Sequence, residues 1–190
     1  MRSERRFTSC SAAAVLFGLV LLGPAPNAAG LLTREEALAA VYPGAAIKAE
    51  QVFLTAEQAK QAAALAGVKI TSPLVARYLA TKDGASLGRA YVDTHVVRTK
   101  KESLLISLDA GGAVKRIDVT AFLEPPEYLA PAPWLNQYRG KPLSDDLRLQ
   151  RAIRPIAGAT LTAAAASQAV RRVLAIDGVL ERGARSEGKR

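Results

Sequence analysis

Hydrophobic and polar residues alternate along the chain between residues 74 and 122, which is the pattern of half-buried β-strands. The alternation is clearest over residues 89–96 and recurs over residues 103–109 and 117–121. In the first of these segments one face holds Ala90, Val92, Thr94 and Val96, and the other holds Arg89, Tyr91, Asp93 and His95. The segments are joined by short links rich in turn-forming residues, at residues 82–84, 99–102 and 110–112. Short links between consecutive strands predict an antiparallel meander.

Helical patterns lie on either side of this region. Before it, two threonines are each followed three residues later by Glu or Gln, which is the spacing of a capping box that opens a helix. The pairs are Thr33 with Glu36 and Thr55 with Gln58. The first helix is short and stops at the Pro-Gly pair 43–44, and an extended stretch follows at residues 47–53. The second helix is rich in alanine and ends at Gly67.

A third helix is predicted from about residue 163 to residue 176. Its small apolar residues recur with helical spacing and allow close packing on a sheet, whereas its polar residues are expected to face water. The apolar stripe consists of Ala166, Ala169, Val170 and Val173, and the water-facing side consists of Gln168, Arg171 and Arg172. We expect the polar, basic tail after Leu180 to be frayed.

A long shaped loop separates the strands from this last helix. Closely spaced prolines exclude a helix interior and a central strand there. They are Pro125, Pro126, Pro131 and Pro133. Together these patterns predict one α+β domain over residues 30–190, in which an antiparallel meander sheet packs against helices.

The first 29 residues have the order of an export signal. Arg2, Arg5 and Arg6 precede an apolar run of roughly a dozen residues, which ends in small residues and prolines. A membrane-spanning helix needs about 20 apolar residues, so a cleaved signal is favoured over a retained anchor. Cleavage after Ala29 removes these three arginines, one glutamate and Cys10, and it lowers the formal net charge from +9 to +7. The expected location is the periplasm or the outer face of the cytoplasmic membrane.

Composition narrows the chemistry that this chain can perform. It holds one Cys, one His and one Met, so it lacks the several soft or imidazole ligands that metal centres and haem need. Its 26 Lys and Arg residues are spread along the chain against 17 Asp and Glu, without the long basic block of a nucleic-acid tail. We therefore expect no metal and no nucleic acid, and redox work would need an organic cofactor.

The segment from Gly158 to Thr162 is the strongest candidate for chemistry. Its sequence, Gly-Ala-Thr-Leu-Thr, runs directly into the alanine-rich helix, where backbone N–H groups and the positive end of the helix dipole favour a phosphate. The small pair Gly158 and Ala159 leaves room for a bulky group to approach the backbone. A plainer interpretation is that Thr160 or Thr162 caps the helix.

This motif resembles the flavin attachment site of the FMN-binding domain found in the G and C subunits of ion-pumping, flavin-containing membrane redox complexes and in related exported proteins. The short first helix ending in Tyr-Pro-Gly, the hairpin strands and the Glu-x-Pro sequence at Glu124 are similar too. The resemblance implies an electron carrier whose Thr160 is esterified by FMN phosphate through a flavin transferase, with Thr162 as a cap or phosphate contact. It also implies membrane or periplasmic redox partners such as cytochromes.

The resemblance also implies that further residues contact the cofactor. They are Gly158, Ala159 and Leu161 of the motif and Glu124 and Pro126 of the loop. The rings of Tyr128 and Trp134 suit the face of an isoalloxazine, or else they seal the loop onto the core. Arg154 and Ala157 depart from the family, which usually has Asp and then Ser or Thr at these positions for recognition by the transferase. Arg154 offers charge to a phosphate instead, so FMN held without an ester is an alternative.

Other functions also stay open. One alternative is a non-redox binding or scaffold module that has lost flavin loading. Another is an enzyme, either a flavin-dependent reductase or a hydrolase that uses Glu124 for acid–base chemistry. Glu127 lies three residues from Glu124, but neither carboxylate has a visible partner that would tune its pKa. His95 is expected on the surface, with no second histidine to complete a metal site. No catalytic residue is assigned.

Overall fold

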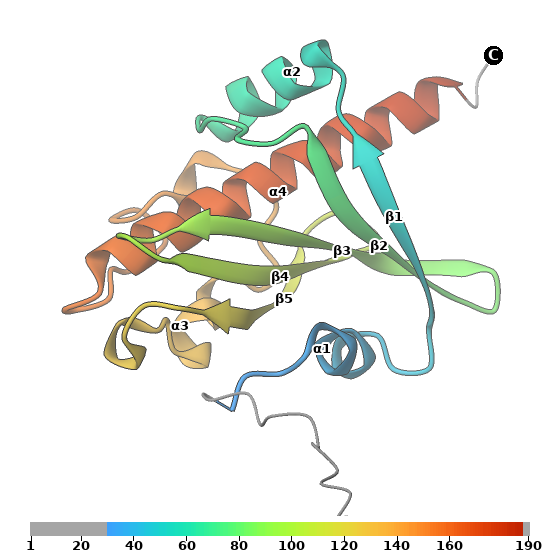
Figure 1. Cartoon of the computed structure of the whole chain (residues 1–190). Coiled ribbons are helices and arrows are strands. Elements are labelled where there is room, and N and C mark those ends of the chain that lie inside the picture. Colours follow the sequence, from blue (N-terminus) through green and yellow to red (C-terminus); the bar gives the residue numbers. More distant parts are fainter. Residues whose placement is uncertain (1–29, 188–190) are drawn as a thin grey trace, which may run out of the picture.

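The computed structural model describes residues 30–187, and the predicted export signal at residues 1–29 lies outside them. Five antiparallel strands form one sheet in which each strand neighbours the next in sequence (Figure 1). The strands are β1 (Ala46–Phe53), β2 (Leu74–Lys82), β3 (Ala85–Val96), β4 (Lys101–Asp109) and β5 (Val114–Phe122). The α+β class with an antiparallel meander, predicted from the alternation of residues, is thus confirmed.

Both predicted capping boxes are present. Their reciprocal hydrogen bonds join Thr33 to Glu36 at the start of α1 (Arg34–Val41) and Thr55 to Gln58 at the start of α2 (Ala56–Ala66). Gly67 ends α2 in the left-handed conformation, as the sequence predicts. The long loop after β5 holds four short helical turns: η1 (Pro126–Tyr128), α3 (Ala132–Leu135), η2 (Asn136–Tyr138) and η3 (Asp145–Leu147). Proline occupies the first turn of both η1 and α3, where its missing N–H is not needed.

The last helix, α4, runs from Thr160 to Glu187 and is longer than predicted. Residues 181–187, where the sequence suggests a frayed tail, are the last two turns of α4, and the Glu, Arg and Ala residues among them have good helix propensity. Residues 188–190 lie outside the described part of the chain.

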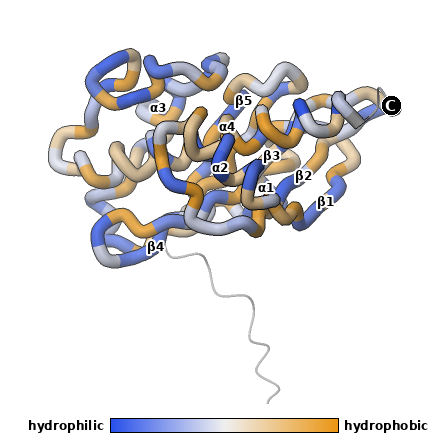
Figure 2. Tube along the Cα trace, turned by 90° about the horizontal axis from the view of Figure 1, so that it is seen from above, coloured by the Kyte–Doolittle hydropathy of each residue, from blue (hydrophilic) through white to orange (hydrophobic). Residues whose placement is uncertain are grey.

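Helices cover both faces of the sheet. The larger core lies between the sheet, α2, α4 and the long loop, and the smaller core lies under α1. Figure 1 shows α4 running along the sheet with its first turns beside the loop that carries α3. Figure 2 shows hydrophilic stretches in the outlying loops and hydrophobic ones among the central elements. The first turns of α4 are therefore held in place by packing in the larger core.

The polar face of β3 is buried beneath α4, so the expectation that Arg171 and Arg172 face water is wrong. Arg172 Nε and Nη2 donate to the Asp93 carboxylate at 2.7 and 2.8 Å. Arg89 of β3 is paired with Asp177 of α4 in the same way. Arg171 donates to the last carbonyl of α2 at 2.7 Å. Strand and helix each present charges to the other, and these charges satisfy one another inside the fold.

His95 is not the surface residue that the sequence suggests. Its side chain is 10% exposed, and its ring nitrogens Nδ1 and Nε2 bond to Asp93 and Glu102 at 2.9 and 3.0 Å. Burial alone would lower the pKa of His95, but the hydrogen bonds to these two carboxylates outweigh burial and raise the pKa to about 9. His95 is therefore a charged imidazolium that ties β3 to β4.

The charge on His95 makes the free energy of unfolding depend on pH in the alkaline range. Since the folded-state pKa of about 9 exceeds the ordinary value of 6.5, the contribution of His95 to the free energy of unfolding is complete below pH 6.5. It is lost as the pH rises through about 9. We expect the urea midpoint of the wild-type chain to fall across this window and that of a His95→Gln variant to stay level. An equal fall in both chains would contradict a charged His95.

Candidate functional site

The first turn of α4 is the predicted phosphate-binding segment. The helix begins at Thr160, so neither Thr160 nor Thr162 stands in front of it as the N-cap residue. Gly158 has a φ of +78°, and the space around it is open for a Cβ or a larger group. Ala159 is buried, and its carbonyl accepts the first helical hydrogen bond from Ala163 at 3.0 Å. The N–H groups of the residues between them have no intrahelical acceptor, as at the start of any α-helix.

The two threonines of the motif have different environments. Thr160 is exposed. Thr162 is 1% exposed, and its hydroxyl donates to the Tyr128 carbonyl at 2.8 Å. The Thr162 hydroxyl is thus engaged in holding η1 against the start of α4. Of the two threonines, Thr160 is the one that is open to solvent.

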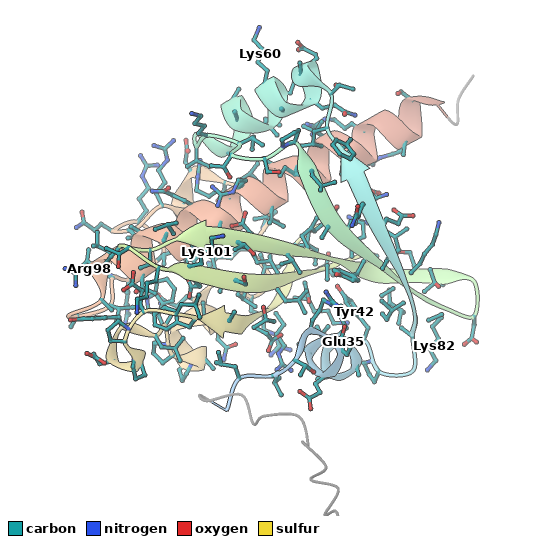
Figure 3. The ribbon with its side chains drawn as sticks, viewed as in Figure 1. Glu35, Tyr42, Lys60, Lys82, Arg98 and Lys101 are labelled. Carbon is teal, nitrogen blue, oxygen red and sulfur yellow. The ribbon has the colours of Figure 1, made fainter. Side chains whose placement is uncertain are left out.

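A hollow of about 290 Å³ opens beside Thr160. We call it the α4 hollow, and it is lined by Arg98, Tyr128, Gly158, Ala159, Thr160, Leu161 and Thr162. The Arg98 guanidinium lies 5.6 Å from the centre of the Tyr128 ring, which is a cation–π distance. Figure 3 shows Arg98 at the end of the molecule where α4 begins. A cation, an aromatic ring and an exposed hydroxyl therefore meet at one opening.

Glu124 holds the turn that carries Arg98. Its Oε1 accepts hydrogen bonds from the backbone N–H groups of Arg98, Thr99 and Lys100 at 3.1, 2.8 and 2.8 Å. The bonds from Thr99 and Lys100, with that from Arg98, lower the pKa of Glu124. Glu124 is 8% exposed and is absent from the lining of the α4 hollow. It positions the Arg98 turn from behind the opening.

Replacing Glu124 with Ala should free this turn while the matched variant Glu127→Ala should not. Glu127 is exposed and lies three residues further along the same loop. We expect amide hydrogen exchange at residues 98–100 to become roughly tenfold faster in Glu124→Ala, because three N–H groups lose one charged acceptor. Mass spectrometry or NMR of the two variants measures this. Equal protection in both would show that Glu124 does not hold the turn.

The other residues predicted to contact the cofactor pack or shape the loop, or lie at the hollow. Trp134 is buried, its Nε1 donates to the Arg154 carbonyl at 2.6 Å, and its ring meets that of Tyr138 edge-on at 5.6 Å. Trp134 thus seals the loop onto the core, which is the second of the two roles open to it, and it does not line the α4 hollow. Pro126 opens η1 and so helps to place Tyr128. Leu161 is exposed at the edge of the hollow.

The arginine at the α4 hollow is Arg98 and not Arg154, which the sequence suggested as a phosphate contact. The Arg154 backbone N–H donates to Gln137 Oε1 at 2.9 Å, and its side chain is exposed and absent from the hollow's lining. Arg98 lines the hollow instead. No sequence signal marks Arg98, since only the closed β3–β4 hairpin brings it to the start of α4.

Comparison of the chain with protein-family models, with curated proteins and with solved structures finds no match. Within residues 30–187, no helix is both long and apolar enough to cross a membrane. In the same residues, no three side chains of His, Cys, Asp or Glu are placed to hold a metal ion.

Proposed function

We propose that this chain is an exported flavoprotein that holds FMN at Thr160, as a phosphoester, and carries electrons between membrane or periplasmic redox partners. The observation that carries the proposal is the exposed Thr160 hydroxyl at the start of a 28-residue helix, beside a hollow that also presents Arg98 and Tyr128. An electron carrier needs its cofactor held and exposed in one place, and it needs no substrate pocket.

The phosphate end of FMN fits the first turn of α4. Its oxygens are acceptors for the N–H groups of residues 160–162, and the helix dipole favours negative charge at this end. The open space at Gly158 lets a phosphate approach the backbone. Arg98 adds a full positive charge and guanidinium donors at the same hollow. These groups would hold FMN with or without an ester.

The hollow also offers contacts for the ring system of FMN. They are the aromatic ring of Tyr128, beside Arg98, and the exposed apolar side chain of Leu161. FMN supplies one- and two-electron chemistry when it is bound. The role of the protein's own residues is to hold the phosphate at Thr160 and Arg98, to orient the flavin ring against Tyr128, and to leave one edge of the ring open to a partner.

Attachment to Thr160 is a phosphoryl-group transfer without net oxidation. The Thr160 hydroxyl oxygen forms a bond to the FMN phosphorus, and the bond between that phosphorus and the bridging oxygen of a flavin dinucleotide breaks. The nucleoside monophosphate leaves, and the hydroxyl proton passes to a base of the flavin transferase. Arg154 and Ala157 are both exposed at the approach to the motif, so a transferase that reads this segment would meet them.

Intact-mass analysis of the exported protein tests the proposal. The chain is produced in a host that exports it and contains a flavin transferase, and it is then denatured. We expect a mass increase of one FMN less one water, with yellow fluorescence that stays with the polypeptide. Colour lost on denaturation would indicate FMN held without an ester. Absence of any flavin would overturn the proposal in favour of a binding or scaffold module.

The geometry disfavours a hydrolase that uses Glu124 as a general acid. The backbone N–H groups of Thr99, Lys100 and Arg98 stabilise the charged form and lower the pKa of Glu124. A general acid needs the opposite shift, so that it holds a proton near neutral pH.

A further inference from the structure

The surface around the α4 hollow combines exposed apolar side chains with cations. We call it the rim, and it consists of Val96, Arg98, Lys100, Lys101, Leu123 and Leu161. Val96 lies opposite Lys101 across the β3–β4 hairpin, and the Leu123 N–H donates to the Lys101 carbonyl at 3.0 Å. Arg98 and Leu161 line the hollow itself. Figure 3 shows Arg98 and Lys101 in the left half of the view and Lys82 at the right.

The apolar residues of the rim are largely open to water. Val96, Leu123 and Leu161 are 55, 58 and 52% exposed. Single exposed apolar residues are common on protein surfaces, but Val96 and Leu123 both lie beside Lys101, and Leu161 lines the hollow. Their removal from water would favour association with an apolar patch of a partner.

The charged residues of the rim leave a surplus of positive charge. Arg98, Lys100 and Lys101 form no ion pair within residues 30–187, whereas the arginines beneath the sheet are paired with carboxylates. The Glu124 carboxylate behind the turn keeps its negative charge, because its three hydrogen-bond donors are neutral backbone N–H groups. Glu124 and Glu127 offset two of the three positive charges, so one positive charge remains in excess.

We infer that the rim is the docking surface for an acidic redox protein with a small apolar contact patch. The inference rests on the proposed function, because it places the partner directly over the opening where FMN would be held. Electron-transfer complexes bury little surface and form quickly, and long-range charge attraction steers them. A basic border around a small apolar centre fits this kind of contact.

Binding of the flavin-free protein to two soluble carriers of opposite charge tests the inference. The probes are an acidic plant-type [2Fe–2S] ferredoxin and a basic cytochrome c, each titrated at low ionic strength. The rim variant is Lys100→Gln with Lys101→Gln, and the matched control is Lys60→Gln with Lys82→Gln. All four lysines are exposed, and both variants change the net charge equally. Figure 3 shows Lys60 and Lys82 away from the rim.

We expect the wild-type protein to bind the ferredoxin and not the cytochrome. The rim variant should bind the ferredoxin roughly fivefold more weakly, and the control should stay within about twofold of wild type. Added salt should reduce this difference. Leu123→Ser should weaken binding at high salt as well, whereas Phe53→Ser, an exposed apolar residue on β1, should not.

With FMN loaded, one electron would pass from the reduced iron–sulfur cluster, which would be oxidised, to the flavin, which would be reduced. We expect the rate of this step to fall in the rim variant by the same factor as the binding constant.

Three outcomes would overturn the inference: no binding of the ferredoxin, equal binding of the cytochrome, or equal loss in the rim and control variants. These outcomes are separate from failure of the proposed function. If FMN is found on Thr160 and the two variants bind alike, only the docking surface is wrong. If the rim variant alone loses binding and the exported chain carries no flavin, the docking surface stands and the FMN proposal fails.

Discussion

Replacing Thr160 with Ala should abolish the FMN adduct completely, because the variant has no side-chain oxygen to bond to phosphorus. Thr160 is exposed at the first position of α4, and Thr162, which is bonded to the Tyr128 carbonyl, is left in place. We therefore expect the free energy of unfolding to change by less than about 0.5 kcal/mol. Intact mass and urea unfolding of the same preparation measure both quantities.

Two further variants separate the hydroxyl from its surroundings. Thr160→Ser keeps an oxygen at the same place and should keep the adduct. Thr162→Val removes the hydrogen bond to the Tyr128 carbonyl, so it should lower the yield of adduct without preventing it. An adduct that survives in Thr160→Ala would show that another residue carries the flavin. Loss of the adduct in Thr160→Ser would show that a hydroxyl at this position is not sufficient and that the methyl group of Thr160 is also needed.

Replacing Asp93 with Ala should cost about 3–5 kcal/mol of unfolding free energy, which is the usual cost of breaking a buried ion pair. The Asp93 carboxylate accepts from Arg172 at 2.7 and 2.8 Å and from His95 at 2.9 Å. Burial alone would raise the pKa of Asp93, but the hydrogen bonds from Arg172 and His95 lower it to about 2. The Ala variant leaves the buried Arg172 without its carboxylate partner, and it leaves the partly buried His95 with Glu102 alone.

Urea unfolding at neutral pH measures this loss. Asp146→Ala is the matched control, because Asp146 is exposed, and we expect it to change the free energy of unfolding by less than about 0.5 kcal/mol. A loss in Asp93→Ala no larger than in the control would mean that the cations find other partners. For the wild type, the lowered pKa of Asp93 predicts stability that is present above pH 3.8 and lost as the pH falls toward about 2.

The elements of the fold were predictable where their signals are local. The period-two alternation, the short links and the two capping boxes each depend on residues a few positions apart, and the structure contains all of them. The burial of Arg172 was not predictable in this way. Its partner Asp93 is 79 residues away, and each residue alone looks like part of a solvated face.

The candidate site was also predictable only where its signals are local in sequence. The exposed Thr160, the nearby Tyr128 and the open space at Gly158 were indicated by the motif and the loop. Arg98 and the backbone clamp of Glu124 were not, because the hairpin must close before the turn reaches either the loop or α4. Trp134 looked equally suited to a flavin or to the core, and only its contacts decide for the core.

The α4 hollow has walls from the β3–β4 turn, from η1 and from the start of α4, so it does not exist in an extended chain. A loading enzyme that recognises the assembled walls can act only once the polypeptide has been translocated and has folded. An enzyme that recognises the five-residue motif alone can act on the unfolded polypeptide during translocation. Pulse labelling of flavin incorporation against the time course of protease resistance distinguishes these two orders of maturation.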